Sequence, residues 1–161
     1  MTVEEYLHTS FDGPDPEYVD GEIVERHLGS VRHSKAQRRV ISFFSRLGDR
    51  HAVHPFPGLT LRISATRCRV PDMAVYFGSE PEEDFPSTPP DVVVEIVSED
   101  DRYSQILEKL AEFHAWGAKH IWLADPGTRT LSVYDRAGLH DVPSFELPEL
   151  GATLSRAEIF S

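Results

Sequence analysis

The apolar residues of this sequence fall into short runs with a period of two or of about 3.6, which predicts strands and helices in alternation. Strands are expected over residues 59–64, 69–77, 91–98, 120–125 and 130–136. Helices are expected over residues 2–9, 33–47 and 104–116, and Gly48 and Gly117 follow the last two as stop signals. The chain therefore alternates between the two kinds of element from end to end.

A hairpin and a mixed sheet complete the expected fold. The Asp20-Gly21 pair stands between strand-like residues of 17–25, which predicts a β-hairpin near the N-terminus. Residues 78–90 are rich in proline and acids, so a surface loop is expected there. The order of elements predicts an α/β or α+β fold, with one mixed β-sheet flanked by helices. The length of 161 residues suits a single domain over 1–161.

Charge is the first property that narrows the function. The net charge of −11 argues against broad, non-specific attraction to phosphate backbones. Residues 26–39 are the exception, because they contain five Lys or Arg, two His and no acid. This segment is either a solvated helix face or a local basic surface.

Several classes of protein find no support in the sequence. It has no apolar stretch of membrane-spanning length, and its acidic, polar start does not resemble a secretory signal peptide, so a cytoplasmic protein is expected. Cys68 is the one cysteine, which excludes an intrachain disulfide and a cysteine-based zinc site and predicts a buried thiol. Gly-x-Ser-x-Gly, Walker and His-Glu-x-x-His motifs are all missing.

Glu95 stands out within the apolar strand predicted over 91–98. Side chains alternate between the two faces of a strand, so Glu95 shares its face with Val93 and Val97. It is therefore not the polar half of an amphipathic strand. A buried carboxylate needs a cation, a hydrogen-bond donor or a metal as its partner.

Asp72 is the first candidate to lie near Glu95. It opens another apolar strand, and the acidic loop allows the two strands to lie side by side. Paired carboxylates repel unless a positive charge lies between them, and hard divalent cations favour such oxygen ligands. The alternative is that Asp72 ends a strand while Glu95 pairs with an arginine.

The helix predicted over 104–116 supplies a second candidate. At 100° per residue its apolar arc contains Tyr103, Ile106, Leu110, Phe113 and Trp116. Lys109 falls on this arc, whereas Gln105, Glu108 and Glu112 lie on the outer side. A lysine on the buried side, soon after a buried glutamate, suggests that the two meet. A lysine that snorkels to solvent and a plain ion pair between Glu95 and Lys109 are the alternatives.

These residues carry a family resemblance. The VPD of 70–72 followed by the VEIVS of 94–98 resembles the PD-(D/E)XK nuclease signature, and the whole chain resembles the Uma2 family of restriction-endonuclease-like proteins, formerly a domain of unknown function. Their order and spacing are specific, although each piece alone is common. The matching pieces are residues 17–22, His33, 70–72, 90–98, 108–109, Phe113 with Gly117, and 122–126.

The resemblance implies a restriction-endonuclease-like fold and a metal-dependent phosphodiesterase site. Asp72 and Glu95 would be the ligands of Mg²⁺ or Mn²⁺, completed by the main-chain carbonyl of Ile96 or Val97. The signature places its lysine two residues after Glu95, where this sequence has Val97. In this family the lysine is displaced to the following helix, which is where Lys109 stands.

Further roles also follow from the resemblance alone. Glu17, and less so Glu22, would place an additional carboxylate near the metal. His33, with Arg32 and Lys35 beside it, would contact the phosphates of the substrate. The alternative is that His33 is a histidine at the start of a helix that faces solvent. Many relatives carry an acid where this sequence has Gln105, so weaker activity is one consequence of this difference.

The leading hypothesis is an endonuclease that depends on Mg²⁺ or Mn²⁺ and acts on DNA. The alternatives are an inactive nuclease fold that binds nucleic acid or a protein partner, and a hydrolase of smaller phosphodiesters. A homodimer is implied by the resemblance, because many such nucleases pair to cut two strands. Ile159 and Phe160 add a weak hint of an interface, although core packing explains them equally well.

Overall fold

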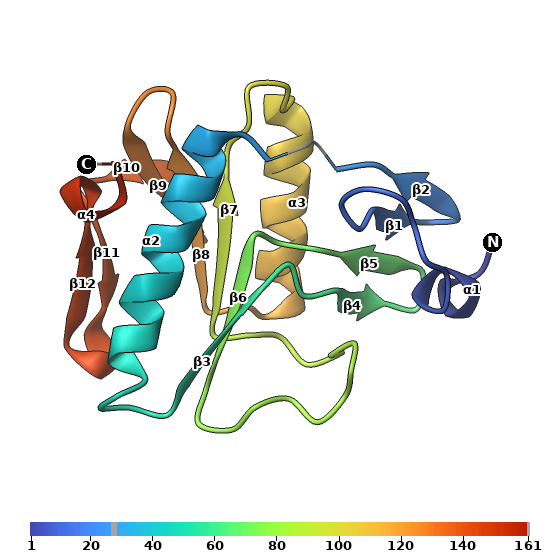
Figure 1. Cartoon of the computed structure of the whole chain (residues 1–161), viewed down its shortest axis with the longest axis horizontal. Helices are drawn as coiled ribbons and strands as arrows, with labels where there is room; N and C mark the ends of the chain where they lie inside the picture. The colour runs from blue at the N-terminus through green and yellow to red at the C-terminus, as the bar shows by residue number, and fades with distance from the viewer. Residues whose placement is uncertain (27–28, 161) are drawn as a thin grey trace.

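A six-stranded mixed sheet forms the centre of the molecule in the computed structural model, which describes residues 1–26 and 29–160 (Figure 1). In spatial order its strands are β10 (Gly138–Val142), β9 (Thr130–Asp135), β8 (His120–Asp125), β7 (Val92–Ile96), β6 (Met73–Phe77) and β3 (Val53–Pro57). The pair β7–β8 is parallel and the other pairs are antiparallel. This confirms the mixed sheet expected from the sequence.

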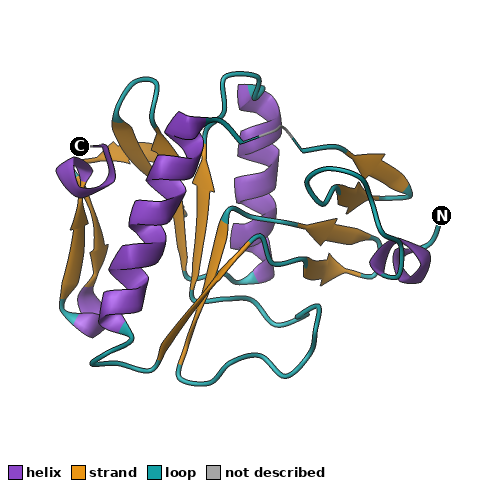
Figure 2. Cartoon of the chain, in the orientation of Figure 1, coloured by secondary structure: helices purple, strands orange, loops and turns teal. Residues whose placement is uncertain are grey.

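Two helices cover the faces of this sheet (Figure 2). The alternation along β7 decides which residues each helix meets. Val92, Val94 and Ile96 join the core on the side of α2 (Val31–Leu47), where Phe44 stacks on Trp122. Val93 joins the core on the side of α3 (Tyr103–Trp116). Glu95 therefore belongs to the α3 side of the sheet.

A second sheet lies beside the first and carries the predicted hairpin. Its strands are β2 (Glu22–Val24), β1 (Glu17–Val19), β5 (Arg67–Arg69) and β4 (Leu61–Ser64), in that spatial order. Asp20 and Gly21 form the β1–β2 turn with φ values of 48° and 95°, a backbone that an Asp-Gly pair tolerates. The short helix α1 (Val3–Leu7) packs on this sheet through Tyr6.

The prediction of one strand over 69–77 is wrong. The chain leaves the second sheet after Arg69 and enters the central sheet at Met73, so β5 and β6 belong to different sheets. Pro71 has no N–H to donate to a ladder, and the N–H of Val70 donates to Glu17 rather than to a strand. The VPD segment is therefore the link between the two sheets.

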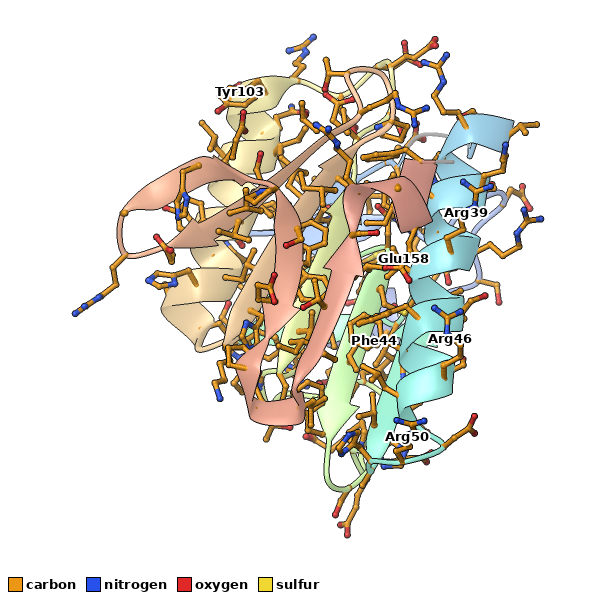
Figure 3. The ribbon with its side chains drawn as sticks, turned by 90° about the vertical axis from the view of Figure 1, so that its left-hand side faces the viewer. Arg39, Phe44, Arg46, Arg50, Tyr103 and Glu158 are labelled. Atoms are coloured by element: carbon orange, nitrogen blue, oxygen red, sulfur yellow. The ribbon has the colours of Figure 1, made fainter. Side chains whose placement is uncertain are left out.

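The C-terminal residues close one edge of the molecule. β11 (Ser144–Leu147), a short 3₁₀ helix (η1, Pro148–Leu150), β12 (Ala152–Ser155) and α4 (Arg156–Phe160) follow one another there. Ile159 is 1% and Phe160 8% exposed, so core packing accounts for both residues and the hint of an interface is lost. Arg39 of α2 also donates to the carbonyl of Ile159 at 3.2 Å, and Arg46 lies near Glu158 (Figure 3).

Two smaller expectations can be compared with the structure. Cys68 is fully buried, as predicted, and burial raises the pKa of its thiol to about 11. Tyr103, in contrast, was placed on the buried arc of α3 but is 62% exposed; it is the first residue of this helix. None of the helices in the described residues combines the length and apolar character needed to cross a membrane.

Candidate active site

A cleft of about 420 Å³ lies between the β1–β2 hairpin, the start of α2 and the first turns of α3. The ends of β6 and β7 form its floor, where Asp72, Glu95 and Ile96 line it. Acidic and basic side chains share the wall. All four residues of the expected catalytic set, Glu17, Asp72, Glu95 and Lys109, line this one cleft.

Asp72 lies opposite Glu95 at the floor. In the antiparallel pair β6–β7, Met73 faces Val94, so the register places Asp72 across from Glu95. The N–H of Ile96 donates to Asp72 Oδ2 at 2.7 Å and fixes the carboxylate, which is only 7% exposed. The expectation that the two strands bring these carboxylates to one place agrees with this register.

Glu95 meets Lys109 rather than an arginine. Lys109 Nζ is 2.9 Å from Glu95 Oε1, and both side chains are 14% exposed. Within the described residues this Oε1 is buried and accepts no well-directed hydrogen bond, although the ion pair is close. Burial raises the pKa of Glu95; Lys109 opposes this rise, whereas Asp72 and Glu17 add to it, and the net shift is upward.

Glu17 is the second partner of Lys109. Its Oε2 is 2.6 Å from Lys109 Nζ and accepts a hydrogen bond from Val70 N at 2.8 Å, while its Oε1 lies 3.4 Å from Arg69. Burial alone would raise the pKa of Glu17, but Lys109 and Arg69 outweigh it and lower the pKa. Lys109 is thus held between two carboxylates and does not snorkel to solvent.

Glu22 has different surroundings from Glu17. It lines the cleft from β2, but it is solvent-exposed, whereas Glu17 is 4% exposed. The two glutamates lie on the same face of the hairpin, because Val19 shares the face of Glu17 and pairs with Glu22. Glu22 is on the edge strand β2, whereas Glu17 is on β1, which is covered on both sides by neighbouring strands. Of the two glutamates, the structure brings Glu17 to Lys109.

His33 and Arg26 pair with Asp72. His33 Nε2 is 3.2 Å and Arg26 Nη2 3.4 Å from Asp72 Oδ1. The hydrogen bond to Asp72 raises the pKa of His33 despite its partial burial. Burial would raise the pKa of Asp72, but His33 overcomes this effect and the pKa is lowered. His33 therefore contacts a proposed metal ligand directly.

The two other expected substrate-binding residues, Arg32 and Lys35, lie outside the cleft lining. Both are exposed on α2, whereas Gln37 lines the cleft and donates to the carbonyl of Asp72 at 2.9 Å. Gln105 lines the cleft from α3, one turn before Lys109.

The two carbonyl candidates also occupy different places. Ile96 lines the cleft beside Asp72 and Glu95. Val97 lies next to a separate hollow of about 250 Å³ on the α3 side, and its N–H donates to Ala124 O. The geometry thus favours Ile96 as the carbonyl nearest to the two carboxylates.

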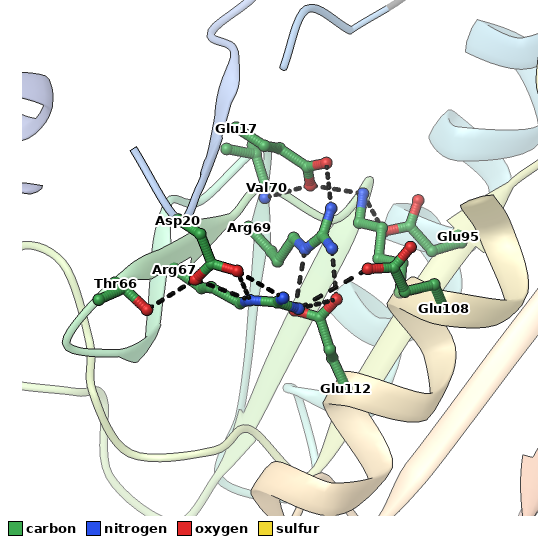
Figure 4. Close-up of polar contacts among 10 residues, drawn as sticks. Glu17, Asp20, Thr66, Arg67, Arg69, Val70, Glu95, Glu108 and Glu112 are labelled. Carbon is green, nitrogen blue, oxygen red and sulfur yellow. Dashed lines mark hydrogen bonds and ion pairs between the residues drawn. The ribbon is translucent and has the colours of Figure 1, made fainter. Parts of the chain in front are cut away.

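Arg69 and Glu112 were missed by the sequence interpretation. Arg69 is 7% exposed and bridges Glu17 to Glu112, as Figure 4 shows. Glu112 was placed on the outer side of its helix, which is wrong, because its side chain is only 14% exposed against Arg69. The sequence contains one signal for Glu112. It stands three residues after Lys109, and residues i and i+3 are neighbours on a helix.

The donor set can be compared with what a divalent cation requires. Asp72 and Glu95 offer carboxylate oxygens on adjacent strands, and Glu95 Oε1 lacks a directed hydrogen bond. Oxygen ligands of this kind suit Mg²⁺ or Mn²⁺. No group of three or more His, Cys, Asp or Glu in the described parts of the chain is arranged to hold an ion together. The pair therefore fits a metal that main-chain oxygens and water also coordinate.

The fold and the cleft together define a class of protein. It has a mixed sheet flanked by helices, two carboxylates at the ends of two central strands, and a buried lysine on α3 that contacts one of these carboxylates. The model of the Uma2 family, described as "Putative restriction endonuclease", matches residues 3–160, and the chain belongs to this family.

A solved structure supports the fold assignment. The crystal structure of "a putative nuclease belonging to DUF820" from Anabaena variabilis ATCC 29413 is similar with a TM-score of 0.86 and 23% sequence identity. The match covers 99% of this chain and 97% of that one. No curated protein matches the sequence.

Proposed function

We propose that this protein is a metal-dependent endonuclease that hydrolyses phosphodiester bonds of DNA. The observation that carries the proposal is the contact of Lys109 Nζ with Glu95 at 2.9 Å, beside Asp72 on the neighbouring strand. Membership of a family described as "Putative restriction endonuclease" supports the choice of DNA as the substrate.

Asp72 and Glu95 would hold Mg²⁺ or Mn²⁺, together with the carbonyl of Ile96. Such an ion, when bound, neutralises charge on the phosphate and lowers the pKa of a coordinated water. The carboxylates that surround Lys109 support this assignment. Burial raises the pKa of Glu95, and the negative charges of Asp72 and Glu17 raise it further. An added cation would relieve this repulsion.

The protein's own groups would position the reacting atoms. Lys109 would orient the attacking water or donate to a phosphate oxygen, where charge develops in the transition state. Glu17 would hold the Lys109 amine in place, because it lies 2.6 Å from this amine and has no free oxygen. His33 would exchange its contact with Asp72 for one with a substrate phosphate.

Nicking of supercoiled plasmid in the presence of Mn²⁺ or Mg²⁺ tests the proposal. We expect nicking by the wild-type protein, and its loss in Asp72→Asn and in Lys109→Ala. Asp84→Asn and Lys119→Ala are matched controls, since both residues are exposed and distant from the cleft lining, and both should nick like the wild type. Nicking that survives both site substitutions would assign the activity to a contaminant.

A second candidate is an inactive nuclease fold that binds nucleic acid or a protein partner. It is favoured by the existing ion pairs, because Lys109 already contacts Glu17 and Glu95, and Asp72 already contacts His33 and Arg26. This candidate predicts DNA binding that Asp72→Asn leaves unchanged, without cleavage in any metal. The same assay with a small chromogenic phosphodiester tests for a smaller substrate.

A further inference from the structure

The contacts of Lys109 continue into a ring of four charged residues, three of whose four links are contacts between side chains. Lys109 meets Glu17 at 2.6 Å, and Glu17 meets Arg69 at 3.4 Å. Arg69 Nε donates to Glu112 Oε1 at 3.1 Å, and its Nη2 makes a second contact with Glu112 Oε2. Glu112 lies one turn after Lys109 on α3, so the helix backbone, and not an ion pair, joins the two ends of this ring. Figure 4 shows the contacts of Arg69 with Glu17 and Glu112.

The ring is almost entirely removed from water. The side chains of Arg69 and Glu17 are 8% and 6% exposed, and those of Lys109 and Glu112 are both 14% exposed. Opposite charges alternate along it, and its two end members have further partners, because Lys109 also contacts Glu95 and Glu112 also contacts Arg67. Removing one partner of a buried ion pair strongly destabilises the folded protein. The position of each of these side chains therefore depends on the charged side chains that it contacts.

Glu17 is the member through which Arg69 acts on the amine. Its Oε2 is used by Lys109 and by Val70 N, and its Oε1 is used by Arg69. Without Arg69, Oε1 would be buried and unpaired, and the carboxylate would turn toward the cleft, which it already lines. Lysine is a flexible chain that ends in a point charge, so Lys109 would then lose one of its two anchors.

We propose that Arg69 and Glu112 are positioning residues that fix the Lys109 amine against Glu95. Glu112 holds the guanidinium of Arg69 from α3 with two contacts, a geometry that restricts its orientation. Arg69 in turn holds Glu17, so β1 and β5 of the second sheet determine where the amine lies. The catalytic meaning of this positioning rests on the proposed function.

Arg67 provides a matched control on the same strand. It lies two residues before Arg69, pairs with Asp20 at 2.7 Å and contacts Glu112 at 3.0 Å. Its side chain is 28% exposed, and its described ion pairs reach neither Glu17 nor Lys109. Loss of Arg67 therefore removes a similar charge without breaking the ring.

Exchange of the amine hydrogens with solvent reports on the position of Lys109 without any need for activity. The chain has three lysines, Lys35, Lys109 and Lys119, so NMR of protein labelled with ¹⁵N at lysine Nζ resolves each one. In Arg69→Met, we expect exchange at Lys109 to accelerate roughly tenfold, the scale of losing one hydrogen bond to a charged group. Exchange should stay at the wild-type rate in Arg67→Met, and Arg69→Lys should recover much of the protection.

Kinetics then test what the positioning does. We expect kcat for DNA cleavage to fall by up to about a hundredfold in Arg69→Met, with KM unchanged, because a misplaced catalytic group costs turnover rather than binding. Unchanged kcat alongside faster exchange would overturn the catalytic role. A merely structural residue would lower thermal stability and leave the exchange rate of Lys109 at its wild-type value.

The remaining outcomes separate this proposal from the proposed function. If Arg69→Met does not fold, Glu112→Gln takes its place, because that change keeps the size of the side chain and removes one charge of the ring. Wild-type exchange at Lys109 in a folded Arg69→Met or Glu112→Gln overturns the proposal. If exchange at Lys109 is faster in the variant but the wild-type protein cleaves no phosphodiester, the nuclease assignment is wrong. The positioning of the Lys109 amine by Arg69 is still supported in that case.

Discussion

The surroundings of Glu95 only partly stabilise the ionised form of its side chain. Burial raises its pKa first, Lys109 counteracts this, and the carboxylates of Asp72 and Glu17 raise it further. Lys109 is moreover shared, because it lies even closer to Glu17 than to Glu95. In metal-free protein the ionised form of Glu95 is therefore a cost to the folded state.

Glu95→Gln should stabilise the metal-free protein at alkaline pH. The pKa of Glu95 is raised from 4.5 to about 8, so its contribution to stability is present below pH 4.5 and is lost as the pH rises toward 8. Relative to the wild type, the variant should gain on the order of 1 kcal/mol, or about 2–4 °C in Tm. Thermal unfolding with a chelator, at pH 5 and pH 9, measures this gain, and exposed Glu99→Gln is the control. A gain that is equal at both pH values contradicts the prediction.

Sequence reasoning reached Asp72, Glu95 and Lys109 but not Arg69 and Glu112. Glu95 and Lys109 follow from local periodicity, since the two-residue period of a strand and the helical wheel each place a charge on an apolar face. Asp72 follows from its place at the start of an apolar run and from the family resemblance. Arg69 becomes informative only when β5 is known to lie beside β1 and against α3. That contact joins residues that are far apart in the sequence, and no local pattern encodes it.

The same difference between local signals and long-range contacts applies to whole helices and strands. The Asp20-Gly21 hairpin, α2 and the strand with Glu95 were predicted, because turn chemistry and apolar periodicity are local signals. β3 was missed because it contains two prolines, Pro55 and Pro57, which an edge strand tolerates. The split between β5 and β6 was missed because the apolar run on either side of Pro71 reads as continuous.

The end of α3 gives a prediction at the scale of an element. Gly117 stops this helix with φ at +116°, a conformation that other residues rarely adopt, and a β-carbon there would lie 3.4 Å from Pro89 Cγ. Gly117→Ala should therefore destabilise the protein by about 1–2 kcal/mol. Chemical denaturation measures the change. Gly29→Ala is the control, since the φ of Gly29 lies outside this region, and an equal loss in both variants would contradict the argument.

At the scale of the whole molecule, the distribution of charge does not favour the electrostatic attraction of DNA to the cleft. The chain has a net charge of −11, and the cleft wall itself includes Glu17, Glu22 and Glu25. The basic residues Arg32 and Lys35 are exposed on α2 but do not line the cleft. Under the proposed function, a phosphate would approach an acidic site, and a bound cation would then assist substrate binding as well as chemistry.

The same acidity complicates any measurement of metal binding, because carboxylates all over the surface attract divalent ions weakly. The specific site is recognised by a difference between variants. A ligand at a hundred times its Kd stabilises the folded state by about 2.7 kcal/mol, so Mn²⁺ should raise the Tm of the wild type by roughly 5–10 °C. Asp72→Asn should lose this increase, whereas exposed Asp84→Asn should keep it. The rise is measured by calorimetry as Mn²⁺ is titrated into chelator-treated protein. An equal rise in all three proteins would place the ions on the acidic surface and leave Asp72 and Glu95 without a metal.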